Sequence, residues 1–228
     1  MDNEILSYFE MCQREGTSLQ QGMNFGIGGD HSVILTSVQA NAPYDDRFED
    51  DGSTLIYEGH DVRRRRDGPD PKAVDQPAVY PTGRALTQNG KFHVAATDYK
   101  KEIREPERVR VYEKLRSGIW SYNGLFHLVD SWQERSGQRT VFKFKLVAVE
   151  ENVSSSTKRL PERRRLIPSD VKREVWKRDR GRCVICGADD ELHFDHDIPY
   201  SKGGASATVE NVRILCARHN LSKGARIE

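Results

Sequence analysis

The stretch from Gly181 to Asn220 reads GRCVICGADDELHFDHDIPYSKGGASATVENVRILCARHN and contains two pairs of metal-ligating residues. Cys183 and Cys186 form a C-x-x-C pair, and Cys216 and His219 form a C-x-x-H pair. Four sulfur and nitrogen ligands on two short turns are the set that a structural zinc ion takes. The gap between the pairs is longer than in an ordinary zinc ribbon, so a folded segment must fill it. The alternative is unrelated cysteines buried as small hydrophobic residues.

The segment between the two pairs predicts a strand, a loop and a helix. Residues 192–198 alternate apolar and polar side chains, which is typical of a half-buried strand and places Asp195 and His196 on opposite faces. Pro199 ends the strand because it has no backbone N–H to donate. Residues 209–221 have apolar side chains at helical spacing, so we expect a helix there.

The Asp195-His196 dipeptide in this segment indicates phosphodiester hydrolysis. A histidine titrates near neutrality and is an efficient base for removing a proton from the attacking water. Mg²⁺ takes one or two protein oxygens and keeps its other waters, so a carboxylate and an amide oxygen would suffice. A soft Cys/His site would not hold Mg²⁺, so we expect zinc at the Cys/His residues and Mg²⁺ at the oxygen ligands. The alternative is a salt-bridged pair at the surface.

Residues 166–228 resemble the HNH nucleases, which have a ββα-metal fold. The resemblance rests on a lead-in helix over residues 169–180, then Gly-Arg-Cys-x-x-Cys-Gly, Asp-His, a Gly-Gly loop, Glu-Asn-Val, and Leu-Cys-x-x-His-Asn with a trailing Lys-Gly. It implies that His196 is the general base and that Asn211 braces the loop that carries the base. It also implies that Asp195 and Asn220 bind a catalytic Mg²⁺ or Mn²⁺ ion. The structural zinc would be held by Cys183, Cys186, Cys216 and His219.

Positive charge is concentrated just before and within the start of this region. The whole chain has a formal net charge of +1, whereas residues 158–182 contain eleven Lys or Arg and four acidic residues, a net charge of +7. Such a segment neutralises phosphates, so we expect salt-sensitive DNA binding. The arginines that we expect to contact DNA here are Arg163, Arg164 and Arg165. The alternative is a solvated helix face with a polar linker.

The first two thirds of the chain read mainly as strands. Stretches rich in β-branched and aromatic residues are separated by Gly, Asp and Pro, and they cover residues 31–38, 54–57, 109–112, 126–130 and 141–149. Residues 2–15 predict an amphipathic helix with Ile5, Leu6, Phe9 and Cys12 on one side. Residues 76–87 predict a short helix. A small, curved, largely antiparallel sheet or barrel is therefore expected.

Residues 25–150 resemble the SRA (YDG) domains, which read modified cytosine in DNA. The motifs are Gly-Gly-Asp-His-Ser-Val at 28–33, Tyr-Asp-Asp at 44–46, Tyr-Glu-Gly at 57–59, Thr-Gly-Arg-Ala-Leu at 82–86 and Trp-Ser-Tyr-Asn-Gly-Leu-Phe at 120–126. In that family the last motif usually contains Tyr-Asp-Gly-Leu-Tyr, so Asn123 and Phe126 are departures. The resemblance implies that the modified base is flipped out of the duplex into a pocket.

The SRA resemblance also implies roles for individual residues. Tyr44 and Tyr57 would stack on the flipped base, and Asp46 or a neighbouring acid would accept from its exocyclic amine. Glu58 lies where a small polar residue is common. The loop that fills the vacated stack would contain Arg63, Arg64, Arg65 and Arg66. The alternatives are sheet packing for the tyrosines, a solvated turn for the acids and a plain exposed loop for the arginines.

These patterns predict an α+β protein with two domains. We expect an N-terminal helical arm over residues 1–22, an SRA-like domain over 23–152, a basic linker over 153–165 and an HNH domain over 166–228. The combination resembles SRA–HNH modification-dependent restriction endonucleases and implies cleavage of double-stranded DNA that carries 5-methylcytosine. Two other classes stay open: a non-catalytic reader of modified DNA, and an HNH nuclease that is indifferent to modification.

Composition and energetics add three expectations. No apolar run is long enough for a membrane span, and cysteines arranged for zinc favour a bacterial cytoplasm. Burial of one methyl group contributes only about 0.8 kcal/mol, so one pocket alone should discriminate weakly. Two coupled pockets, one in each subunit of a dimer, would add their free energies of discrimination and would place one nuclease centre on each DNA strand. We therefore expect a C2 homodimer.

Overall fold

A computed structural model of the chain describes residues 3–27, 29–149, 166–198 and 208–223. It has a mixed α+β fold, as predicted. The elements in chain order are β1 (Glu4–Ser7), α1 (Tyr8–Arg14), β2 (Met23–Asn24), β3 (Ser32–Thr36), β4 (Arg47–Glu49), η1 (Asp50–Gly52), β5 (Thr54–Glu58), η2 (Pro71–Ala73), α2 (Gln88–Lys100), β6 (Glu107–Arg116), β7 (Ile119–Ser136), β8 (Arg139–Ala148), α3 (Ser169–Arg178), β9 (Leu192–His196), η4 (Val209–Asn211), β10 (Val212–Cys216) and α4 (Ala217–Lys223). Among the described helices, none is long and apolar enough to cross a membrane.

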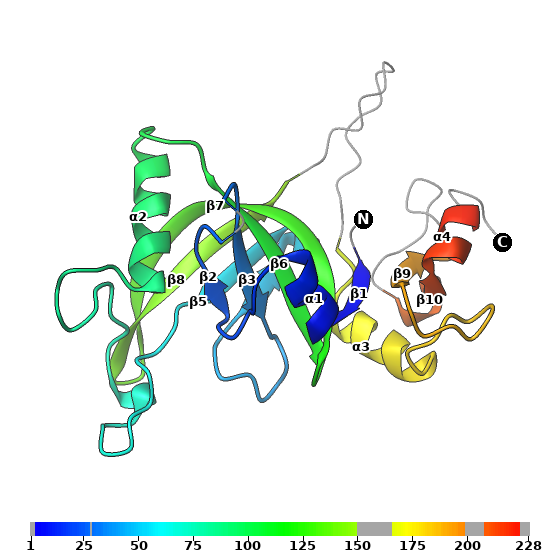
Figure 1. Cartoon of the computed structure of the whole chain (residues 1–228), viewed down its shortest axis with the longest axis horizontal. Helices are drawn as coiled ribbons and strands as arrows, with labels where there is room; N and C mark the ends of the chain where they lie inside the picture. Colours follow the sequence, from blue (N-terminus) through cyan, green and yellow to red (C-terminus); the bar gives the residue numbers. More distant parts are fainter. Residues whose placement is uncertain (1–2, 28, 150–165, 199–207, 224–228) are drawn as a thin grey trace.

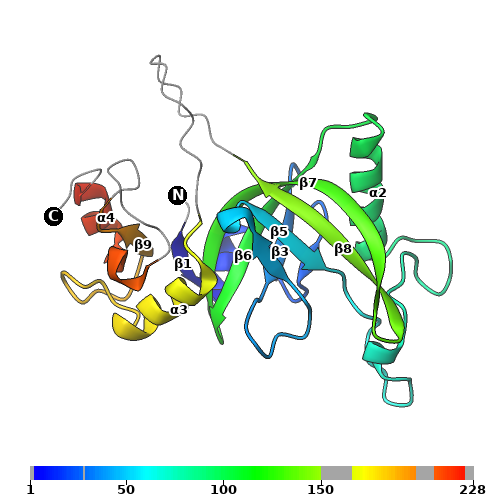
Figure 2. The same ribbon diagram turned by 180° about the vertical axis from the view of Figure 1, so that it is seen from behind.

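The long strand β7 is the centre of the N-terminal domain. It pairs antiparallel with β6 on one side and with β8 on the other, and β3 continues the sheet parallel to β6. Strands β8, β5 and β4 curl round to form the second wall (Figure 2). Helix α2 packs against the sheet (Figure 1). Phe92 from this helix is fully buried against Phe144 and Phe25. The strands predicted from β-branched and aromatic stretches are all present.

The N-terminal segment joins the two domains through a strand. Ile5 in β1 pairs with Ser121 in β7 and with Leu192 in β9, so one sheet runs from the first domain into the second. The prediction of a helix over residues 2–15 is therefore wrong for its first half. The Ser7 side chain accepts from the backbone N–H of Glu10, and this capping box begins α1 only at Tyr8.

The C-terminal domain is a ββα unit that packs against α3. Strands β9 and β10 pair antiparallel and α4 follows directly, with the lead-in helix α3 packed beside them (Figure 1). The buried core includes Val171 and Val175 from α3 together with Ile214 from β10. The helix predicted over residues 169–180 is confirmed, although α3 ends at Arg178.

Two helix predictions are wrong. Residues 209–221 contain strand β10 before α4, because a short apolar run fits either period and pairing with β9 buries Val212 and Ile214. Residues 76–87 form a loop with an isolated bridge between Val79 and Leu86. This segment contains two prolines and a glycine, which disfavour a helix, and α2 begins after the Thr87 cap.

Candidate nuclease centre and base-binding cavity

Four predicted zinc ligands meet at the end of the C-terminal domain. Cys183, Cys186, Cys216 and His219 place their ligand atoms within 4.8 Å of one another. His219 Nδ1 lies 3.2 Å from Cys216 Sγ and 3.5 Å from Cys183 Sγ. All three cysteines are free thiols, and their arrangement fits one tetrahedral ion. The residues that were far apart in sequence therefore form a site that could bind a metal such as zinc.

The environment of Cys183 favours its ligand form. Burial opposes ionisation of the thiol, but backbone hydrogen bonds from Cys216, Cys186 and Ile185 outweigh it and lower the pKa of Cys183 to about 6. A thiolate is the form that binds a metal, so the turn is prepared for coordination.

His196 is the last residue of β9 and is half-buried beside β10. Its Cα pairs with that of Val212. Burial lowers the pKa of His196 below its ordinary value of 6.5, although the carboxylate of Asp195 opposes this effect. The ring atom Nε2 is buried and has no hydrogen-bond partner among the described residues. The imidazole is therefore neutral at pH 7, which is the protonation state that a general base requires.

Asp195 lies in an ion pair with Lys223 at the end of α4. Lys223 Nζ is 2.5 Å from Asp195 Oδ2, and it also donates to the backbone oxygen of His196. Arg213 Nε lies 3.9 Å from the same carboxylate oxygen. Asp195 Oδ1 has no hydrogen bond within the described part of the chain, so this oxygen fits a divalent cation while Oδ2 is occupied by Lys223. Asn220, the other predicted ligand, lies on α4, which contacts β9.

Asn211 fixes the segment that follows the predicted base. Its Oδ1 accepts from the Ile198 N–H at 2.8 Å, and its Nδ2 donates to the Ile198 oxygen at 3.1 Å. The Asp197 N–H donates to the Asn211 oxygen at 2.9 Å. These bonds hold the chain two residues after His196.

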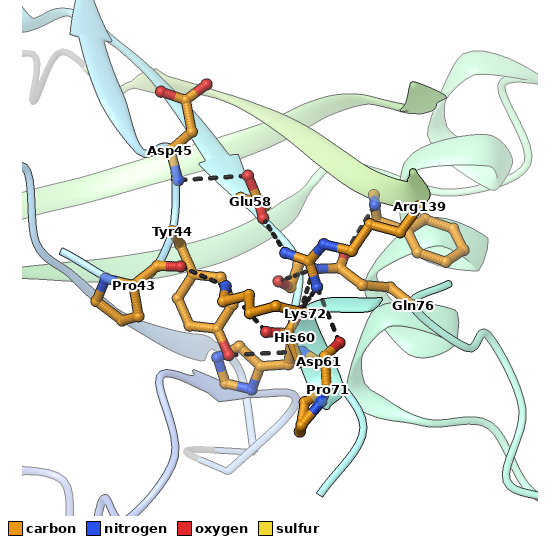
Figure 3. Close-up of polar contacts among 12 residues, drawn as sticks. Pro43, Tyr44, Asp45, Glu58, His60, Asp61, Pro71, Lys72, Gln76 and Arg139 are labelled. Atoms are coloured by element: carbon orange, nitrogen blue, oxygen red, sulfur yellow. Dashed lines mark hydrogen bonds and ion pairs between the residues drawn. The ribbon is translucent and has the colours of Figure 1, made fainter. Parts of the chain in front are cut away.

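In the N-terminal domain a cavity of about 580 Å³ brings together Tyr44, Asp46 and Glu58. Lys72 and Arg139 also line it (Figure 3). A neighbouring cavity of about 690 Å³ shares Tyr44 and Asp46 and adds Tyr57 and His60. Three of the four predicted base-binding residues therefore surround the first cavity, whereas Tyr57 lines only the second.

The two tyrosines predicted to stack on the base differ in exposure, because Tyr44 is partly exposed and Tyr57 is buried. Tyr57 is 1% exposed, and its hydroxyl lies 3.1 Å from His60 Nε2. The His60 ring stacks on Tyr44 with centroids 5.6 Å apart, and the Lys72 ammonium lies 4.1 Å from the Tyr44 centroid. Burial lowers the pKa of His60 to about 4, so the stacked ring is neutral. His60 is thus an aromatic wall that the sequence motifs did not indicate.

The acids of the cavity are held by specific bonds. Asp46 Oδ1 accepts from the Glu58 N–H at 2.9 Å and Oδ2 accepts from Thr36 Oγ1 at 2.7 Å. Burial raises the pKa of Asp46 to about 6. Glu58 forms ion pairs with Arg139 and Lys143 at 3.0 and 3.1 Å. Arg139 was not indicated by the sequence, because no motif covers the start of β8.

The predicted DNA-contacting arginines divide into two groups. Arg63, Arg64, Arg65 and Arg66 are exposed in the loop after β5. Arg163, Arg164 and Arg165, together with the basic linker, lie outside the described residues. The exposed loop leaves its four guanidinium groups available to phosphates.

Comparisons with known proteins cover both domains. The SAD/SRA domain model matches residues 7–152, and the HNH endonuclease model matches residues 183–226. No curated protein matches the chain significantly. Among solved structures, SUVH5 SRA with hemi-methylated CG DNA is 22% identical, with 66% of this chain and 89% of that chain covered and a TM-score of 0.45. The modification-dependent TagI restriction endonuclease is 19% identical over 97% of this chain and 76% of that chain, with a TM-score of 0.41.

The SAD/SRA model spans more than half of the chain, and the HNH model includes the Cys183–His219 metal site and the β9–β10–α4 unit. The chain therefore belongs to the SAD/SRA domain family and carries an HNH endonuclease domain, which makes it a DNA endonuclease.

Proposed function

We propose that this endonuclease depends on DNA modification: its SRA domain flips and binds 5-methylcytosine, and its HNH domain hydrolyses the phosphodiester backbone. The observation that carries the proposal is the joining of the two domains through β1, which pairs with both β7 and β9. A base held in the first domain therefore fixes the position of the second domain on the same duplex.

The cutting step is assigned to His196. Its neutral imidazole takes the proton of the attacking water, and the Asn211 bonds to Ile198 hold the chain that follows the base. A Mg²⁺ or Mn²⁺ ion bound by Asp195 and Asn220 would neutralise developing charge on the phosphate. Cys183, Cys186, Cys216 and His219 would hold a zinc ion, which would keep β10 and α4 against the turn that precedes β9.

The reading step is assigned to the cavity around Tyr44, with Asp46 and Glu58 as its acids and Tyr57 behind His60. Stacking and hydrogen bonds to the base offset the few kcal/mol that flipping requires. The exposed loop 63–66 contacts the duplex near the base, because it begins two residues after Asp61, which binds the cavity residues Lys72 and Arg139. Arg163–Arg165 supply further phosphate contacts.

The proposal includes the cellular and oligomeric context. A site of three thiols requires a reducing compartment, which favours a bacterial cytoplasm. Two coupled pockets in a C2 homodimer would strengthen discrimination and cut both strands. Sedimentation of the free and DNA-bound enzyme tests this, and a monomer that makes full double-strand breaks contradicts it.

One plasmid, prepared with and without cytosine methylation, tests the main proposal. We expect cutting of the methylated form with Mg²⁺ or Mn²⁺ and none with EDTA. Equal cutting of both forms would identify a nuclease indifferent to modification. Binding without cutting under every metal condition would identify a non-catalytic reader.

A further inference from the structure

We propose that the ion pair between Glu58 and Arg139 reads the Watson–Crick edge of the flipped base and selects cytosine over thymine. The inference rests on the proposed function and adds a specificity residue, Arg139, to the base site. Glu58 is the last residue of β5 and Arg139 is the first residue of β8. Both line the cavity beside Tyr44 (Figure 3).

The pair has a fixed geometry. Arg139 Nη2 lies 3.0 Å from Glu58 Oε1, and the two side chains are only 5% and 3% exposed. Arg139 Nη1 contacts Asp61 and lies 3.3 Å from the Pro71 oxygen, while Glu58 Oε2 accepts from Lys143 Nζ at 3.1 Å. Because other residues already bind both side chains, neither side chain has to reorganise when a base binds.

The order of donors and acceptors in this pair matches cytosine. The Watson–Crick edge of cytosine presents an amine donor at N4 beside acceptors at N3 and O2. A carboxylate accepts only and a guanidinium donates only, so Glu58 beside Arg139 presents an acceptor next to donors. Guanine presents the same order to cytosine in a base pair. Arg139 Nε makes no hydrogen bond to any described residue, so donor capacity remains for a base.

Thymine carries the same 5-methyl group as 5-methylcytosine, but the donors and acceptors on its Watson–Crick edge are in a different order. Its O4 is an acceptor and would face the Glu58 carboxylate, and its N3–H is a donor and would face the Arg139 guanidinium. Both contacts would be repulsive in a buried site, and a site built for hydrogen bonding rejects such a mismatched analogue strongly.

The stacking position for the base lies next to the pair. Lys72 Nζ lies 4.1 Å from the centroid of the Tyr44 ring, and the His60 ring stacks on Tyr44 with centroids 5.6 Å apart. Lys72 also lies 2.9 Å from Asp61 Oδ2, and the other oxygen of Asp61 binds Arg139. A planar base that replaces the Lys72 ammonium over Tyr44 would therefore lie near Asp61, the residue that also binds Arg139. The Lys72 side chain is 42% exposed, so it can move to solvent.

Asp46, the acid indicated by the sequence, is less suited to this role. One of its oxygens holds the Glu58 N–H and the other holds Thr36 Oγ1. The Glu58 oxygens also accept hydrogen bonds, from Arg139, Lys143 and the Asp45 N–H. Glu58 differs from Asp46 because its carboxylate pairs with the guanidinium, whereas Asp46 supports the Glu58 backbone.

Binding to three matched duplexes tests the inference in the wild-type enzyme. Each duplex carries one variable base opposite guanine: cytosine, 5-methylcytosine or thymine, with EDTA present to prevent cutting. A T·G mismatch flips more easily than a methylated C·G pair. A pocket that senses only stacking and the methyl group must bind thymine at least as tightly as 5-methylcytosine. We expect the reverse, with 5-methylcytosine preferred by at least about tenfold.

The outcomes separate the inference from the proposed function. If thymine and 5-methylcytosine bind equally and both exceed cytosine, the edge-reading role is wrong and modification sensing stands. If cytosine and 5-methylcytosine bind equally and both exceed thymine, the proposed modification sensing fails while the edge-reading role stands.

Substitutions test which side chains contact the Watson–Crick edge of the base. Glu58→Gln can turn its amide N–H₂ toward O4 of thymine, so the preference for 5-methylcytosine should fall to within about threefold. Arg139→Met should lose affinity for 5-methylcytosine, whereas Arg135→Ala, at an exposed site on the same hairpin, should behave as wild type. Relaxed selectivity in Asp46→Asn but not in Glu58→Gln would overturn the assignment. Thermal melting of each variant checks that it is folded.

Discussion

Lys172 Nζ lies 2.9 Å from Glu113 Oε2, and this fully buried ion pair links α3 of the nuclease domain to β6 of the SRA domain. Asn123 completes the contact: its Oδ1 accepts from Lys172 at 2.7 Å and its Nδ2 donates to Glu113 at 3.0 Å. Asn123 is the residue that departs from the usual Tyr-Asp-Gly segment. An amide can both donate and accept, whereas an ionised aspartate would place a second negative charge beside Glu113.

The first prediction concerns this junction. Lys172→Met should destabilise the protein by about 3 kcal/mol, because it leaves the buried Glu113 carboxylate without its cation. Adding Glu113→Gln should restore part of that loss by removing the unpaired charge. Chemical denaturation measures both, and Lys177→Met, at an exposed site on the same helix, is the control. Equal effects of Lys172→Met and Lys177→Met would contradict the prediction.

The same pair predicts how stability depends on pH. Burial opposes ionisation of Glu113, but Lys172, Ser169 and Asn123 outweigh it and hold its pKa below the ordinary value of 4.5. A lowered pKa in the folded state gives stability that is present above 4.5 and lost as pH falls through the lowered pKa. Melting curves of wild type and the Lys172→Met/Glu113→Gln variant should therefore converge as pH falls below 4.5.

The second prediction concerns zinc. Metal analysis of the purified protein should find one zinc per chain, and Cys183→Ser should reduce that content and expose the C-terminal domain to protease. The SRA domain has its own core and should stay protected. Cys12→Ser is a matched control because this thiol lies on α1, away from the cluster. Zinc loss in the Cys12 variant would count against the assigned ligands.

The third prediction concerns His196. His196→Ala should lower the cleavage rate by about 10²–10⁴-fold while modified DNA is still bound and zinc content is unchanged. The pKa of His196 is below 6.5, and the base acts when neutral, so the wild-type rate should be constant near pH 7 and fall only below pH 6.5. A rate that already falls between pH 8 and pH 7 would disagree with a buried neutral imidazole.

The fourth prediction concerns the Lys223 ammonium, which shares Asp195 with the expected catalytic cation. Lys223→Met removes a positive charge 2.5 Å from Asp195 Oδ2, so the carboxylate should attract a dication more strongly. The Mn²⁺ concentration for half-maximal cutting, and that for Mn²⁺ binding measured by calorimetry, should both fall severalfold. Arg218→Ala, at an exposed site on α4, should leave both unchanged. An unchanged metal requirement in Lys223→Met would place the cation away from Asp195.

Spacing and residue type were sufficient to indicate the metal site and the nuclease strand. The two ligand pairs and the Asp195-His196 dipeptide lie in a few neighbouring residues, so the sequence alone indicated the HNH domain and the four residues of the metal-binding cluster. The period-2 pattern likewise identified β8. Short apolar runs were ambiguous, since residues 212–216 satisfy helical and strand spacing equally.

Only the tertiary structure decided how these parts meet. It showed that β1 is a strand shared by both domains, that Lys172 is buried against Glu113, and that Arg139 lies beside Glu58. Each of these contacts joins residues more than 50 positions apart in the sequence. The local pattern of apolar and polar residues indicates the type of an element and its buried face. The partner of a strand or of a buried charge depends instead on packing between distant elements.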